Sequence, residues 1–130
     1  MIIDHIGILV SDADKSISFF ENCLAPLGIR IYQRLPEFGA VIFSGEADFP
    51  FLFVGQAEGS YHGTEVRIPG YRPMHLALAA PNRAAVDAFH REGMTHGGRD
   101  NGIPENCGNG YYAAYLLDPD GNNIEAGIRE

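Results

Sequence analysis

Residues 111–127 read YYAAYLLDPDGNNIEAG, and this stretch predicts two strands joined by a tight turn. Pro119 presets one backbone angle of the turn, and the side chains of Asp118 and Asp120 can cap it. Just past the turn, Glu125 places a carboxylate in an otherwise apolar strand. A buried carboxylate is costly unless it is paired or binds a metal ion, whereas on a solvated sheet face, the commoner situation, it needs no partner. The polar residues of the other strands decide between these two interpretations.

The chain contains an internal repeat. Hydrophobic patterning and helix signals predict a strand, a helix and three strands, at residues 2–10, 13–24, 29–34, 39–44 and 49–54. A polar stretch follows, and then the order restarts with a strand at 74–80, a helix that starts at Pro81-Asn82 and ends at Gly93, a short strand near Thr95, and the hairpin at 111–128. When His5 is placed over His75, Phe19 falls on Phe89 at the same offset. Duplication therefore explains the pattern better than a chance similarity between two generic βα units.

This repeat predicts an α+β fold. We expect two βαβββ modules that form an eight-stranded, cup-like open β-barrel with flanking helices. The 130 residues suit one domain. Module one would span about residues 1–56, the linker about 57–71, and module two about 72–130.

Composition limits the possible partners. A net charge of −8 argues against nucleic-acid binding, which needs a basic surface. No segment is long and apolar enough to predict a membrane span, and the N-terminus begins directly with a strand-like pattern. Two cysteines form neither a disulfide framework nor a metal-spaced cluster, so a cytoplasmic location is expected.

Three polar residues are candidates for one metal site. Side chains two apart share a face of a strand, and the residue two positions after His5, His75 and Glu125 is small in each strand: Gly7, Ala77 and Gly127. Small neighbours leave room on that face, as the lining of a cleft requires. Two imidazoles and one carboxylate form a facial set that is typical of catalytic metals and leaves coordination positions open. Each histidine alone is more often an ordinary structural residue, but together they favour a metal site.

At these residues the chain resembles the vicinal oxygen chelate superfamily, which includes glyoxalases, bleomycin-resistance proteins and extradiol dioxygenases. The resemblance covers nearly the whole chain and rests on three motifs, DHIG at residues 4–7, MHLA at 74–77 and DPDGNNIE at 118–125. It implies paired βαβββ modules around a divalent metal ion (Fe, Mn, Zn, Ni or Co) with ligands at His5, His75 and Glu125.

Two departures separate this chain from well-known members. Glyoxalase I-type enzymes usually have a fourth ligand, a glutamate, on the closing strand of the first module, where this chain has Phe51 or Phe53. Extradiol dioxygenases share the spacing of Tyr115 and Glu125, but their upstream histidine is absent from residues 106–110. Tyr115 is therefore a candidate to orient or protonate a substrate, and a tyrosine packed on the hairpin is the equally weighted alternative.

Further residues are candidates for substrate binding. Residues 97–110 form a glycine-rich stretch that predicts a long loop, and such loops are often functional. This loop would either cover the cleft, with Arg99 or Asn101 meeting polar substrate groups, or be a simple hairpin connection. An aromatic wall suited to a planar ligand would come from Phe51, Phe53, Tyr112 and Tyr115.

Two functions from different classes fit the sequence. The first is a metal-dependent small-molecule enzyme, a lyase, isomerase or extradiol-type dioxygenase, whose substrate chelates the ion through vicinal oxygens. The second is a metal-free antibiotic-binding protein like the bleomycin-resistance members. The resemblance also implies a homodimer, and an open curved sheet has edges to protect. The sequence leaves open whether one chain or two complete the metal site.

Overall fold

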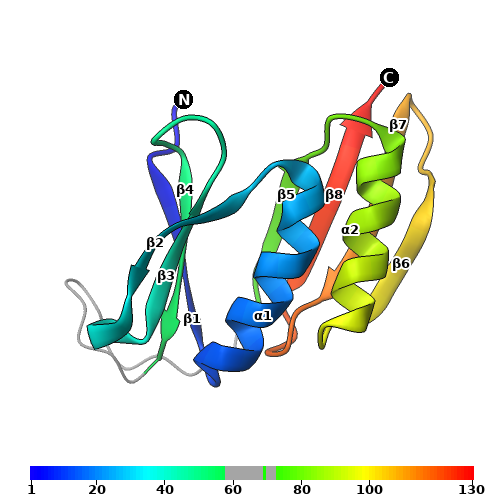
Figure 1. The fold of residues 1–130 in the computed structure, drawn as a ribbon. Coiled ribbons are helices and arrows are strands. Elements are labelled where there is room, and N and C mark those ends of the chain that lie inside the picture. Colours follow the sequence, from blue (N-terminus) through cyan, green and yellow to red (C-terminus); the bar gives the residue numbers. More distant parts are fainter. Residues whose placement is uncertain (58–68, 70–72) are drawn as a thin grey trace.

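The computed structural model describes residues 1–57, 69 and 73–130 of the chain (Figure 1). The first module contains β1 (His5–Val10), α1 (Ala13–Leu24), β2 (Arg30–Leu35), β3 (Ala40–Ser44) and β4 (Phe51–Gln56). The second contains β5 (His75–Ala79), α2 (Arg83–Thr95), β6 (Arg99–Asn106), β7 (Tyr111–Leu117) and β8 (Asn123–Arg129). Nearly all of the predicted linker at 57–71 lies outside the described residues.

The two modules repeat one topology, which confirms the predicted duplication. The strand order is β1-β4-β3-β2 in one four-stranded sheet and β5-β8-β7-β6 in the other. In each sheet the first strand pairs in parallel with the last one, and the remaining pairs are antiparallel. The predicted α+β class is therefore correct, but within the described residues of one chain the two sheets stay separate and do not close into a barrel.

Each sheet has one face covered by a helix and one open face. Helix α1 packs on the first sheet, α2 packs on the second, and the two helices pack against each other. Their contact is visible in Figure 1, where α1 and α2 lie side by side. Phe19 and Phe89, equivalent by the repeat, are both fully buried in the single core that results. Along β1, Ile8 and Val10 face this core whereas His5 is exposed. The predicted assignment of strand faces is thus confirmed.

Both helices begin as the sequence predicts. The side chain of Asp12 accepts a hydrogen bond from the Lys15 N–H at 3.2 Å, and the side chain of Asn82 accepts one from the Ala85 N–H at 2.8 Å. Such caps satisfy backbone donors that have no partner within the helix. Helix α2 continues to Thr95, beyond the predicted end at Gly93.

The glycine-rich stretch at residues 97–110 differs from its prediction. It forms no long loop, because residues 99–106 are the edge strand β6, paired with β7. The short strand predicted near Thr95 corresponds to β6, which begins at Arg99 because α2 continues to Thr95. The register between β6 and β7 shifts on both sides of Gly102, so the strand is irregular at the glycine. Pro104 has no N–H to donate, which an edge strand tolerates. A loop that covers a cleft is therefore not available here.

The turn between β7 and β8 fixes the position of β5. The buried Asp118 carboxylate accepts hydrogen bonds from the backbone N–H groups of Asp120 and Asn122, at 3.0 and 2.7 Å. The Asn122 side chain in turn accepts the Met74 N–H at 3.0 Å, directly before β5. Asp120 accepts the backbone N–H of Ser11 at 3.1 Å, which ties the turn to module one. This turn therefore sets the register in which β5 and β8 pair.

Candidate metal and substrate site

His75 and Glu125 lie together on the open face of the second sheet. The β5–β8 register places His75 opposite Asn123 and Ala77 opposite Glu125, so the two polar side chains are diagonal neighbours. His75 Nε2 is 2.7 Å from Glu125 Oε2. The His75 side chain is 54% exposed and that of Glu125 only 6%. A nearly buried carboxylate thus presents one oxygen to an imidazole that faces solvent.

Two tyrosines of β7 surround the same carboxylate. The Tyr111 hydroxyl donates a hydrogen bond to Glu125 Oε1 at 2.6 Å, and Tyr115 lies opposite Glu125 in the strand register. Burial and the adjacent Glu125 raise the pKa of both phenols to about 12. Both therefore remain protonated donors at neutral pH.

Glycines on neighbouring strands make room for these two rings. A Cβ atom added to Gly127 would lie far inside contact distance of the Tyr111 ring, and one added to Gly102 would lie 2.7 Å from the Tyr115 ring. The rings therefore lie against bare backbone. This explains the small residue two positions after Glu125, and it explains why a glycine interrupts β6.

His5 occupies the equivalent place on the open face of the first sheet. Its ring stacks on Phe51 with centroids 4.7 Å apart and an interplanar angle of 6°. His5 Nδ1 lies 2.6 Å from Asp4 Oδ1. When Nδ1–H donates to that carboxylate, Nε2 carries the lone pair. A carboxylate bonded to the other ring nitrogen fixes metal-binding histidines in this same arrangement. The His5 side chain is 53% exposed.

The three predicted ligands do not converge within one chain. No group of three or more His, Cys, Asp and Glu side chains among residues 1–57, 69 and 73–130 is placed to hold a metal ion.

The strand register shows which residue of module one is equivalent to Glu125. Gly7 pairs with Phe53 as Ala77 pairs with Glu125, so Phe53 takes the place of the carboxylate.

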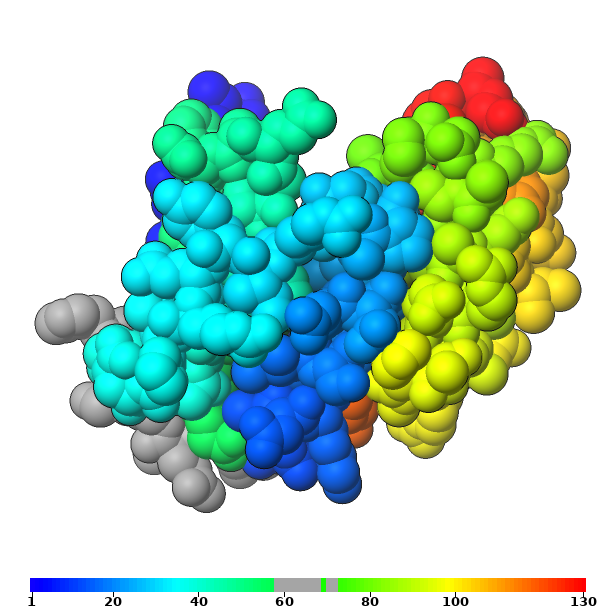
Figure 2. Space-filling view, viewed as in Figure 1, coloured from blue at the N-terminus to red at the C-terminus, as the bar shows by residue number. Residues whose placement is uncertain are grey.

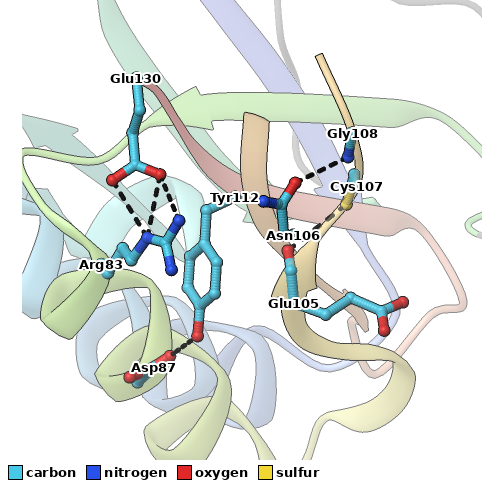
Figure 3. Close-up of polar contacts among 8 residues, drawn as sticks. All are labelled: Arg83, Asp87, Glu105, Asn106, Cys107, Gly108, Tyr112 and Glu130. Carbon is cyan, nitrogen blue, oxygen red and sulfur yellow. Dashed lines mark hydrogen bonds and ion pairs between the residues drawn. The ribbon is translucent and has the colours of Figure 1, made fainter. Parts of the chain in front are cut away.

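Three of the predicted substrate-binding residues belong to the second sheet and fall on both of its faces, whereas Phe51 and Phe53 belong to β4 of the first sheet. Asn101 donates a hydrogen bond to Asn123 at 3.1 Å, and Arg99 is aligned with Leu117, so both belong to the face that carries Glu125. Tyr112 points to the opposite, helix-covered side, where its hydroxyl donates to Asp87 of α2 at 2.6 Å and Arg83 lies 4.5 Å above its ring (Figure 3). The structure therefore brings Arg99 and Asn101 together with Glu125 but keeps Tyr112 apart.

An apolar pocket of about 290 Å³ lies between the two modules. It is lined by residues of β1, β3 and β4 on one side and of β5 on the other, and Phe51, the ring stacked on His5, is part of its wall. The surface is hollowed between the modules at the end of the molecule where both termini lie (Figure 2). An apolar group of a ligand could occupy this space next to His5.

Two residues of the site were not predicted from the sequence. Tyr111 precedes Tyr115 by four positions, so strand alternation places both on the Glu125 face and places Tyr112 on the other. That signal was present in the sequence and separates the three tyrosines. The second residue, Asp4, directly precedes His5, but an aspartate before a histidine does not by itself predict the bond to Nδ1.

The fold and the arrangement of these residues define a glyoxalase-like protein, and comparison with known proteins agrees. The model of the Glyoxalase/Bleomycin resistance protein/Dioxygenase superfamily matches residues 2–126, and the chain belongs to this superfamily. It is 32% identical over 126 residues to the uncharacterized protein YwbC of Bacillus subtilis (strain 168). The aligned region covers 95% of this chain and 94% of YwbC.

Solved structures show the same fold. A glyoxalase/bleomycin resistance protein from Albidiferax ferrireducens T118 has a TM-score of 0.77 and 27% identity, with 98% of each chain covered. A lactoylglutathione lyase from Agrobacterium tumefaciens has a TM-score of 0.67 and 20% identity, with 97% of this chain and 92% of that chain covered. The second likeness concerns the fold alone.

None of the helices in the described residues is both long and apolar enough to cross a membrane.

Proposed function

We propose that the protein is a divalent-metal-dependent enzyme acting on a small molecule, of the glyoxalase/dioxygenase type, with His5, His75 and Glu125 as metal ligands. The observation that carries this proposal is the 2.7 Å approach of His75 Nε2 to Glu125 Oε2 on an open sheet face. An imidazole and a carboxylate at this separation supply two of the donor types that Fe, Mn, Zn, Ni and Co accept. The donor set therefore fits such an ion.

A homodimer would complete the site. The His75–Glu125 pair and His5 lie on the open faces of different sheets, and α1 and α2 pack between the modules. Pairing the first sheet of one subunit with the second sheet of another would cover both open faces. The partner subunit's His5 would then approach His75 and Glu125. Burial of Phe51 and Phe53 at that junction would add apolar contact area, which drives association.

The chain's own residues suggest how a substrate would be handled. A bound divalent ion would polarise two adjacent substrate oxygens and stabilise negative charge that develops on one of them. Tyr111 holds Glu125 Oε1 through its hydroxyl and so orients the carboxylate. Tyr115, protonated at neutral pH, can donate a hydrogen bond to a substrate oxygen. Asn101 and Arg99 extend this polar face along β6.

The second candidate function is metal-free binding of an apolar small molecule such as an antibiotic. The apolar pocket beside His5 favours it, because such pockets bury most of a ligand of this size. Sequestration alone would not use the His75–Glu125 pair. The two functions differ in whether the protein binds a metal ion.

Anaerobic purification followed by metal quantification tests the proposal. We expect stoichiometric binding of a divalent ion by the native protein, strong loss in His75→Ala and Glu125→Gln, and no loss in the control His96→Gln, whose ring is bonded within α2 to the Glu92 carbonyl at 2.8 Å. Spectral assays on catechols and hemithioacetals would then separate oxygenase from lyase or isomerase chemistry. Absence of a bound metal, with no affinity for added Fe(II), Mn(II) or Zn(II), would favour the metal-free binder.

Subunit mixing tests whether two chains share the site. His5→Ala and His75→Ala subunits are each expected to bind little metal alone. A mixed dimer would contain one intact set of ligands out of two. Random exchange of equal amounts makes half of the dimers mixed, so metal binding of the mixture should return to about a quarter of the native level. If mixing restores nothing while both variants still dimerise, the shared site is excluded.

A further inference from the structure

We propose that the substrate is an anion and that Arg129 binds its negative group; this rests on the proposed function in placing the substrate at Glu125. Arg129 is aligned with Tyr111 in the β7–β8 register, so it belongs to the face that carries Glu125. Its guanidinium lies 4.1 Å from the centroid of the Tyr111 ring. The hydroxyl of that same ring is bonded to Glu125. One tyrosine therefore separates the arginine from the candidate metal ligand.

The stacking holds the guanidinium in a defined orientation. A planar cation over an aromatic face is attracted by the ring, and its N–H donors remain free at the edges. These donors match the two oxygens of a carboxylate or a phosphate. Tyr111 thus has contacts on two sides, a carboxylate at its hydroxyl and a cation over its face.

Among the described residues, Arg129 has no carboxylate partner of its own. In a chain with a net charge of −8, most basic side chains of the described residues form ion pairs: Lys15 with Asp12, Arg34 with Glu21, Arg83 with Glu130, and Arg91 with Glu92. Arg30, Arg99 and Arg129 form none within the part of the chain that the structure describes. Arg67 and Arg72 lie outside that part.

The neighbouring carboxylate is occupied elsewhere. Glu130 follows Arg129 directly, but its side chain is turned to the helix side, where it accepts hydrogen bonds from Arg83 at 2.6 and 2.9 Å (Figure 3). Within residues 1–57, 69 and 73–130, Arg129 is therefore an uncompensated cation at one end of the Glu125 face. Arg99, aligned through Leu117 with Asn123 and His75, is a second such cation on another side of Glu125.

This arrangement selects for charge on the substrate. The vicinal oxygens would meet the site at His75 and Glu125, and a separate carboxylate or phosphate would reach Arg129. A neutral compound of the same shape would leave this cation without a partner. Discrimination between the two is therefore the property to measure.

A matched pair of probes isolates the charge. The compounds 3,4-dihydroxybenzoate and 3,4-dihydroxybenzamide have the same ring and vicinal oxygens and differ in the charge of one group. Calorimetric titration of each into metal-free and into Mn(II)-supplemented protein should show about tenfold tighter binding of the benzoate, since a hydrogen bond between two charged groups adds roughly that factor. Arg129→Gln should remove most of this preference. Arg129→Lys should keep part of it, and the control Arg91→Gln, an exposed arginine on α2, should keep all of it.

The outcomes separate this proposal from the proposed function. Equal affinity for the two probes, no measurable binding of the benzoate, or a preference that survives in Arg129→Gln overturns the anion site. Failure of the metal proposal would appear instead in metal quantification, and the benzoate-to-benzamide ratio in metal-free protein does not depend on it. Circular dichroism of each variant confirms that the fold is retained.

Discussion

Cys23 of α1 and Gly93 of α2 occupy equivalent positions of the two modules and meet where the helices pack together. Each follows its strand histidine by eighteen residues in the sequence. A Cβ atom added to Gly93 would lie 3.3 Å from the Cys23 Cβ and far inside contact distance of Leu116 Cδ1. Contact between equivalent residues is expected at an approximate two-fold axis between repeated units. The glycine allows α2 to approach both α1 and its own sheet.

Gly93→Ala should therefore destabilise the protein. In an exposed helix the change would stabilise by up to about 1 kcal/mol, but here the added methyl group overlaps Leu116 and Phe19. Overpacking of this kind costs about 1–3 kcal/mol, so we expect a net loss in the free energy of unfolding, measured by urea titration. The control Gly45→Ala, where nothing lies within 4 Å of the added atom, should be close to neutral. An unchanged midpoint for Gly93→Ala would show that the helices separate without cost.

Asp118→Ala should lower stability more than an exposed substitution does. The fully buried carboxylate accepts two backbone N–H groups and the Asn122 amide, and its loss leaves buried donors without partners. A loss of about 2–3 kcal/mol is expected from chemical denaturation. The exposed Asp48→Ala provides the control and should stay within about 0.5 kcal/mol of the native protein.

The same substitution should also affect the candidate site. Asn122 connects the turn to Met74, directly before His75, so a disordered turn would loosen the β5–β8 register. Metal affinity is then expected to fall in Asp118→Ala even though residue 118 is not a ligand. Equal stability losses in Asp118→Ala and Asp48→Ala would contradict a structural role for this turn.

Much of this organisation could be predicted from the sequence because local signals and the repeat agree. The helix caps at Asp12 and Asn82, the final hairpin and the alternation of strand faces are all determined by nearby residues. Strand β6 was predicted too early and too short, near Thr95, for the opposite reason. Residues 99–106 have weak strand preference, and only pairing with β7 holds them extended.

The candidate site divides in the same way. Alternation together with the parallel β5–β8 register brings His75 to Glu125, and both follow from sequence patterns within one module. The position of His5 relative to that pair depends on how the two modules pack, which no local pattern encodes. Tyr112 was grouped with Tyr115 by residue type. Strand alternation instead places Tyr111 and Tyr115 on one face of β7 and Tyr112 on the other.

Tyr111 and Tyr115 should ionise at a higher pH than an ordinary tyrosine in the metal-free protein. The pKa of each is raised from 10.0 to about 12 by burial and by Glu125. Since the folded pKa exceeds the unfolded one, the stabilising contribution is complete below pH 10 and is lost as pH rises from 10 through 12. The tyrosinate absorbance of Tyr111 and Tyr115 should therefore appear only well above pH 10, and the denaturation midpoint should fall over this window. Tyr111→Phe should remove one of the phenols that ionise at high pH.

The two cysteines should differ in reactivity towards dithiobis-nitrobenzoate. Cys23 is fully buried at the contact between the helices, and burial raises the pKa of its thiol, so little thiolate forms and the reagent cannot reach it. Cys107 is exposed between β6 and β7. We expect one thiol to react in the native protein and both to react in denaturant, with Cys107→Ser abolishing the native reaction.

Because Cys23 becomes accessible only when α1 and α2 separate, its labelling rate reports the opening of the module contact, and Gly93→Ala should accelerate it. Equal labelling rates for both thiols in the native protein would mean that the two modules are not held together by this helix pair.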